Sequence, residues 1–177
     1  MKIRQKQSRH LNQNPPAENN NFNPNNDYDI WVLLDQAHFA VTRSRLLELA
    51  QFNLTKEQTQ VLYVLTMWGG SATMNQIASF TMRQRHSVST LVNRMEKVGL
   101  VKKVKVPKEK VFKVIMTKKG KDRFERVTRE SIEMVFSSLS AADKRKFVLY
   151  LNQLQKKARS LLGLDYKPPF LKRTATD

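Results

Sequence analysis

Apolar residues recur at spacings of three and four over most of the chain, which predicts a mainly helical protein. The first such run, residues 29–51, is apolar over much of its circumference, so the helix that it predicts needs partners on more than one side. Two shorter helices are predicted after Thr55 and Thr73, because each threonine precedes a glutamine by three residues, the spacing of a capping box. A fourth helix is predicted over residues 84–98, and Gly99 ends it.

Alternation of apolar and polar residues replaces the helical spacing in the next segment. Residues 100–106 and 111–117 predict two β-strands joined as a hairpin. Helical spacing then returns, and we expect one long helix over residues 118–138 and a last helix that Ser140 caps. The second, third and fourth predicted helices, followed by the hairpin, have the arrangement of a winged helix-turn-helix.

The balance of charges points to a polyanionic partner. The 177 residues include 32 lysines and arginines against 15 acids, a formal net charge of +17. A small protein this basic usually binds nucleic acid or an anionic membrane face. Residues 83–121 alone hold 13 of the cations and two acids, a net charge of +11. The charge is therefore concentrated on the part of a winged helix-turn-helix that meets DNA.

Other kinds of site find little support in the composition. The chain has no cysteine, so it has no disulfides, no thiolate zinc ligands and no cysteine nucleophile. Its three histidines, His10, His38 and His86, are scattered, which argues against a histidine metal site. No nucleophile–base pair or glycine-rich phosphate loop is apparent. We expect no metal, no cofactor and no enzymatic activity.

Residues 1–26 differ in composition from the rest of the chain. They begin with basic residues and continue with a run rich in asparagine and proline, which predicts a disordered tail. The tail is either a leader without function or a basic arm that touches phosphates. The sequence has no apolar stretch long enough to span a bilayer and no signal peptide, so we expect a cytoplasmic protein without a membrane partner.

The predicted fourth helix has an apolar side around Val88 and Met95 and a polar side opposite. Small hydroxyls allow a helix to lie deep in a groove, asparagine pairs bidentately with adenine, and arginine pairs with guanine. An ordinary solvated face is the alternative. The candidates for reading bases are Arg85, His86, Ser87, Ser89, Thr90, Asn93 and Arg94. The candidates for the DNA backbone are Thr73, Arg83, Lys97, Lys103, Lys105, Lys108 and Lys110.

The segment from Leu54 to Gly120 resembles the MarR family, the multiple-antibiotic-resistance-type transcriptional regulators of bacteria and archaea. The matching stretches are LTKEQTQVLYVL (54–65), MNQIASF (74–80), SVSTLVNRMEKVGLVKK (87–103) and MTKKG (116–120). Within them, the 14-residue run VSTLVNRMEKVGLV corresponds to the family's recognition helix and the entry to its wing.

The wing departs from the family's pattern. The family usually carries an Asp-x-Arg motif there, in which the aspartate steadies the loop and the arginine enters the minor groove. Lys108 and Lys110 stand at these places, with Glu109 between them. Because lysine lacks the planar fork of arginine, we expect the wing to attract phosphates or the minor groove with less shape-specific reading.

The resemblance implies a mainly α fold, a winged helix-turn-helix with a two-stranded wing flanked by long N- and C-terminal dimerisation helices. It implies a sequence-specific regulator, a repressor that binds double-stranded DNA as a homodimer on a pseudo-palindromic operator. The expected parts are the basic, asparagine-rich tail (1–26), the N-terminal dimerisation helix (27–52), the DNA-binding domain (53–120), the C-terminal dimerisation helices (118–163) and a tail (164–177).

Family members commonly release DNA when a small aromatic or phenolic ligand binds between the dimerisation helices and the DNA-binding lobe. An aromatic or anionic ligand is therefore a further expected partner, although aromatic residues at helical spacing more often form core. The candidate pocket residues are Trp31, His38, Phe39, Tyr63 and Trp68. A non-specific architectural winged helix that binds DNA or RNA is the alternative to the regulator, and the lysine-rich wing would suit it.

Overall fold

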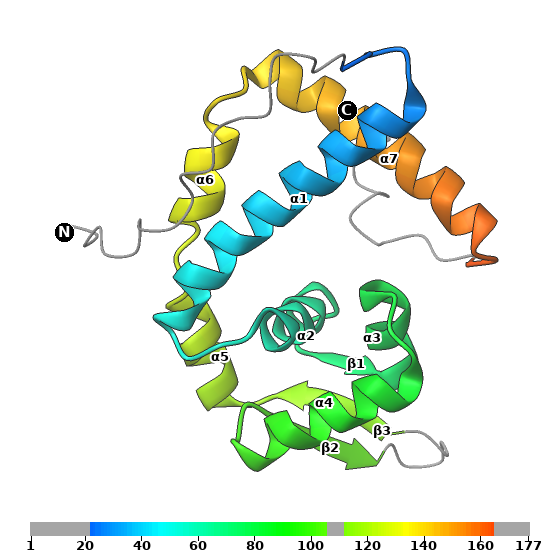
Figure 1. Cartoon of the computed structure of the whole chain (residues 1–177). Helices are drawn as coiled ribbons and strands as arrows, with labels where there is room; N and C mark the ends of the chain where they lie inside the picture. Colours follow the sequence, from blue (N-terminus) through cyan, green and yellow to red (C-terminus); the bar gives the residue numbers. More distant parts are fainter. Residues whose placement is uncertain (1–21, 106–111, 165–177) are drawn as a thin grey trace, which may run out of the picture. The chain divides into compact units, whose positions relative to one another are not determined.

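The computed structural model describes residues 22–105 and 112–164 (Figure 1). The elements in chain order are α1 (Asp27–Ala50), α2 (Lys56–Met67), β1 (Ser71–Thr73), α3 (Met74–Thr81), α4 (Arg85–Lys97), β2 (Val101–Lys105), β3 (Phe112–Met116), α5 (Lys118–Glu125), α6 (Glu130–Phe136) and α7 (Ala141–Leu161). The chain divides into two units, and the boundary falls within α1, after Phe39.

The first unit contains the beginning of α1. The helix starts after Asn26, whose side-chain oxygen accepts a hydrogen bond from the backbone N–H of Tyr28 at 2.9 Å. The rings of Tyr28 and Trp31 pack at a centroid distance of 5.5 Å. Several large apolar side chains of this segment are nevertheless exposed, Trp31 by 56% and Phe39 by 69%.

The second unit contains a winged helix built on a small antiparallel sheet. The strand order is β1-β3-β2, with Ser71 opposite Ile115 and Val101 opposite Met116. The fold class predicted from the sequence is confirmed, but the sheet has a third strand beyond the two of the wing. Three residues are too few to show an alternating pattern, and β1 forms because the β3 edge offers it a ladder.

Helices α2, α3 and α4 enclose one core with this sheet. Its fully buried members include Val61, Leu62 and Leu65 of α2, Ile77 of α3, Val88, Val92 and Met95 of α4, and Val101 and Val114 of the wing strands. Both predicted capping boxes are present, at Thr55 with Gln58 and at Thr73 with Gln76. The spacing of the fourth helix is also confirmed, since α4 buries the predicted apolar side.

The prediction of a single helix over residues 118–138 is wrong, because the helix is interrupted between α5 and α6. The break contains Thr128, whose hydroxyl and carbonyl groups both bond to residues at the end of α1. Tertiary hydrogen bonds thus override a helical spacing that continues through the break. The predicted start of α7 is confirmed, because Ser140 accepts from the backbone N–H of Asp143 at 3.1 Å.

Candidate nucleic-acid interface

Helices α3 and α4 are joined by a tight turn that sets the direction of α4. Met82 adopts a left-handed conformation at φ 51°, and the N–H of Arg83 bonds back to the carbonyl of Ala78 at 3.1 Å. Helix α4 then begins after Gln84, whose side chain makes no capping bond. The helix–turn–helix expected from the sequence is therefore formed by α3 and α4.

The polar side of α4 faces outward. Val88, Val92 and Met95 are completely buried against the core, which fixes the rotation of the helix about its axis. Of the seven candidate base-reading residues, Ser87 and Ser89 are half-buried, and the exposed ones are Arg85, His86, Thr90, Asn93 and Arg94. These five exposed side chains belong to one helix, and Asn93 among them also bonds to Lys103 of β2.

A hydrogen-bonded cluster joins α4 to the first wing strand. Lys103 of β2 donates from Nζ to the side-chain oxygen of Asn93 at 2.7 Å and pairs with Oε2 of Glu96 at 3.0 Å. The backbone N–H of Lys103 also donates to Oε1 of Glu96 at 2.8 Å. This backbone hydrogen bond, with help from the Lys103 ammonium, lowers the pKa of Glu96 below its ordinary value. From the sequence, Asn93 was a candidate for reading bases, Lys103 was a candidate for the DNA backbone, and Glu96 had no predicted role.

The candidates for the DNA backbone do not form a single group. Arg83 pairs with Glu57 of α2 at 3.2 Å, and the hydroxyl of Thr73 serves as the cap of α3. Lys97 and Lys105 are exposed near the ends of α4 and β2. Lys108 and Lys110, together with the departure from the family's wing motif, lie outside the described residues.

A second set of bonds attaches the C-terminal end of α4 to α5. The hydroxyl of Thr117 donates to the carbonyl of Gly99 at 2.7 Å and also caps α5. Lys119 donates from Nζ to the carbonyl of Val98 at 2.8 Å, satisfying a free carbonyl at the end of the helix. The position of α4 is therefore set from both of its ends.

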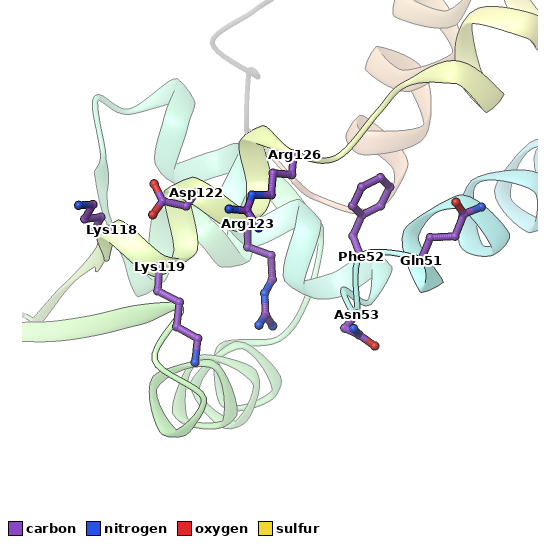
Figure 2. Close-up of a pocket in the computed structure, with 8 residues that line it drawn as sticks. All are labelled: Gln51, Phe52, Asn53, Lys118, Lys119, Asp122, Arg123 and Arg126. Atoms are coloured by element: carbon purple, nitrogen blue, oxygen red, sulfur yellow. The ribbon is translucent and has the colours of Figure 1, made fainter. Parts of the chain in front are cut away.

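A basic cleft of about 610 Å³ lies between α5 and the loop after α1. Figure 2 shows Lys119 and Arg123 extending from α5 to the same side, while Phe52 and Asn53 come from the loop. Its lining also includes Lys118, Asp122 and Arg126, so four cations face one acid. No local pattern in the sequence indicates this cleft, because its two walls lie more than 60 residues apart.

A larger groove of about 1000 Å³ opens between α2, α5 and the start of α6. Its wall combines Tyr63, Phe124 and Ile132 with the cations Arg45 and Arg129. Of the five predicted pocket residues, only Tyr63 lines it. Trp68 packs edge-on against the ring of Phe80 at 6.1 Å, and the remaining candidates, Trp31, His38 and Phe39, belong to the first unit.

A buried carboxylate holds the end of α1 to the start of α6. Glu48, 7% exposed, accepts from the hydroxyls of Thr128, at 2.6 Å, and of Ser131, and from Arg45 at 2.5 Å. Burial alone would raise the pKa of Glu48, but these hydrogen bonds outweigh it and hold the pKa at about 2. Arg45, which also lines the larger groove, is thereby tied to the same junction.

In residues 22–105 and 112–164, the histidine, aspartate and glutamate side chains form no group of three that could hold a metal ion. None of the helices in these ranges is long and apolar enough to cross a bilayer.

Comparison with known proteins agrees with this geometry. Residues 52–110 match the sequence model of the MarR family. An organohalide-sensing transcriptional regulator, solved without ligand, is 25% identical and has a TM-score of 0.71, over 86% of this chain and 91% of that one. No protein with a curated description matches the sequence.

Two more distant structures share the fold. AbsC, a MarR-family regulator from Streptomyces coelicolor, is 20% identical over 76% of this chain and 97% of its own, with a TM-score of 0.70. MarR from E. coli, solved with operator DNA, is 16% identical over 71% of this chain and 92% of its own, with a TM-score of 0.65.

The fold and the outward polar helix define a winged helix-turn-helix DNA-binding protein. In sequence, residues 52–110 are similar to the MarR family of transcriptional regulators, and the fold agrees with that similarity.

Proposed function

We propose that the protein is a repressor that binds a pseudo-palindromic operator as a homodimer, with one α4 helix of each subunit in successive major grooves. The observation that carries the proposal is the exposed face of α4, where Arg85, Asn93 and Arg94 stand above a completely buried apolar side. A side chain on such a helix keeps a defined position relative to base edges. A regulator that binds an operator in this way would act in the cytoplasm.

Exposed apolar surface supports the dimer. In the first unit, α1 exposes Trp31, Leu33 and Phe39 by more than half. In the second unit, α7 exposes Leu149, Leu154 and Leu161 by 54% or more. Contiguous apolar side chains on long helices usually mark an interface, and a twofold axis brings the same surface of two subunits together.

The basic residues and the polar residues would act differently on DNA. Exposed lysines such as Lys97 at the end of α4 and Lys105 at the end of β2 would neutralise phosphates irrespective of sequence, and they would make the affinity fall steeply with salt. The side chains on α4 would read bases and so set the operator sequence. If phosphate contacts were the only ones, the protein would bind DNA without sequence preference, as in the architectural alternative that its net charge of +17 also suits.

A small ligand would bind in the larger groove and release the DNA. Its aromatic wall of Tyr63 and Phe124 suits an apolar ring, and Arg45 or Arg129 suits a phenolate or carboxylate. The organohalide-sensing regulator has been solved with 2,4-dichlorophenol and NadR with 4-hydroxyphenylacetate. Because Arg45 is also bonded to Glu48, an anion in the groove would compete for the contacts that hold α1 to α6.

The proposed function is tested by selecting bound fragments from the host genome and measuring affinity for one selected duplex, a random duplex and an RNA at one salt concentration. We expect the selected duplex to bind at least 10³-fold more tightly than the others. Equal affinities would contradict sequence-specific binding and favour the architectural alternative. The ligand is tested separately, by adding 4-hydroxyphenylacetate or 2,4-dichlorophenol to the protein–DNA complex; Tyr63→Ala should abolish any release.

A further inference from the structure

We propose that Lys103 is a positioning residue that turns the side-chain amide of Asn93, so that Asn93 reads a guanine edge instead of pairing with adenine. The inference rests on the proposed function and adds to it a base preference at one operator position. It also changes the role of Lys103, which the sequence placed among the residues for the DNA backbone.

The bond between these side chains leaves only one orientation for the amide. An ammonium group carries three donors and no acceptor, so the partner of Lys103 Nζ at 2.7 Å must be the oxygen of Asn93. The amide nitrogen of Asn93 is then directed away from Lys103. Asn93 is exposed, so its two N–H groups are available to a base.

Glu96 holds Lys103 in place before any DNA arrives. One carboxylate oxygen of Glu96 pairs with Lys103 Nζ at 3.0 Å, and the other accepts the Lys103 backbone N–H at 2.8 Å. Both side chains are about one-third exposed, and the helix and strand that carry them are anchored by the fully buried Met95 and Val101. The orientation of Asn93 is therefore built into the unbound protein, which lowers the cost of ordering it on binding.

This orientation disfavours adenine. The bidentate pair of asparagine with adenine requires the amide oxygen to accept from the amino group at N6 while the nitrogen donates to N7. In this protein the Lys103 ammonium already occupies one lone pair of that oxygen and places a positive charge 2.7 Å from it. The partly positive amino group of adenine would be repelled by that charge.

Guanine offers the matching edge. Its major-groove edge has two acceptors, N7 and O6, and no donor. The N–H groups of Asn93 would reach these acceptors, because Lys103 keeps the amide oxygen turned away from the base. Asn93 thus presents only donors to the base, and Lys103 acts through this orientation alone.

Selection of bound duplexes from a randomised library tests the proposal, with wild type, Asn93→Ala, Lys103→Met and the double variant. Asn93→Ala should remove the preference at one position of each half-site, and wild type should select guanine there. Lys103→Met should shift the guanine-to-adenine ratio at that position by about tenfold toward adenine. The double variant should behave like Asn93→Ala there, because Lys103 acts through Asn93.

The matched control is Lys102→Met, which removes the same charge from the neighbouring, exposed position of β2. It should weaken binding to all sequences and leave the base preference unchanged. Thermal unfolding of each variant verifies folding. A second variant, Glu96→Gln, keeps an acceptor for the Lys103 backbone and should shift the ratio in the same direction by a smaller factor.

The outcomes separate this inference from the proposed function. Adenine selected by wild type at the Asn93-dependent position, or guanine retained in both Lys103→Met and Glu96→Gln, would overturn the role of Lys103 while leaving sequence-specific binding intact. A preference that Asn93→Ala does not alter anywhere would overturn it as well. If wild type enriched no sequence at all, the proposed function itself would fail.

Discussion

The hydroxyl of Thr128 donates to Oε1 of Glu48 at 2.6 Å, across 80 residues of sequence. This bond marks the point where the chain leaves α5 and begins α6 beside the end of α1. The same carboxylate also binds Ser131 and Arg45, so a charged, buried group fixes the junction. Removing one hydrogen-bond partner of a buried charge usually lowers the free energy of unfolding by more than the net contribution of that bond, because the charge is left buried without the partner.

Stability should depend on the ionisation of Glu48. The pKa of Glu48 is held at about 2 in the folded protein, below its ordinary value of 4.5. A lowered pKa contributes stability that is fully present above pH 4.5 and is lost as the pH falls toward 2. Glu48→Gln should therefore lower the free energy of unfolding at pH 7, by up to about 3 kcal/mol, and flatten its decline over this pH range.

Urea unfolding at a series of pH values measures the effect. The matched control is Glu133→Gln, which neutralises an exposed carboxylate on α6 and should change stability by less than about 0.5 kcal/mol. Parallel pH profiles for wild type and Glu48→Gln would show that the junction does not depend on this charge.

Gly120 should not accept a side chain. A Cβ atom at this position would lie 2.1 Å from the carbonyl oxygen of Leu100, which is backbone and cannot move aside cheaply. Gly120→Ala should therefore push α5 away from the turn that follows α4 and destabilise the protein by about 1–3 kcal/mol or more. Denaturant unfolding tests this, with the exposed Asp122→Ala as control; equal stability of the two variants would disprove the close approach.

Substitutions on α4 and on the wing should have different signatures. Arg94→Ala should cost about 1–3 kcal/mol on the selected operator and relax one base position, because it removes a base contact. Lys105→Ala should weaken binding to all duplexes alike and reduce the salt slope by about one. Titrations on matched and mismatched duplexes at several salt concentrations distinguish the two. Identical behaviour of the variants would contradict the proposed division between bases and phosphates.

The apolar surface of α7 should be required for the dimer. Leu154 and Leu161 are exposed by 54% and 77%, so charged replacements would not disturb the core of the second unit. The double variant Leu154→Arg/Leu161→Arg should be a folded monomer with much weaker operator binding, whereas the control Gln153→Arg should remain dimeric. Sedimentation equilibrium gives the mass of each. A monomeric wild type at the concentrations that bind DNA would rule out the proposed assembly.

Local signals in the sequence were sufficient for the elements that build the winged helix. The glutamines that follow Thr55 and Thr73 predicted two helix starts, and the apolar spacing of Val88, Val92 and Met95 predicted which side of α4 is buried. Such features depend on neighbours in the chain, so spacing alone reveals them.

Features that depend on distant residues were missed. The break between α5 and α6 is stabilised by Glu48, and β1 exists because β3 pairs with it. The bond from Lys103 to Asn93 joins a strand to a helix, and no spacing within either element indicates it. The groove wall likewise combines Tyr63, which was among the five predicted pocket residues, with residues of α5 and α6 that the aromatic pattern did not indicate.

Site-directed cleavage of DNA tests most directly whether α4 lies in the major groove as one of a twofold pair. The chain has no cysteine, so Thr90→Cys on the exposed side of α4 provides a unique attachment point for an iron chelate that cuts nearby DNA. We predict two clusters of cuts about one helical turn apart, symmetric about the operator centre. Lys157→Cys on α7 should give none. Cuts from α7 without cuts from α4, or a single unpaired cluster, would contradict the account.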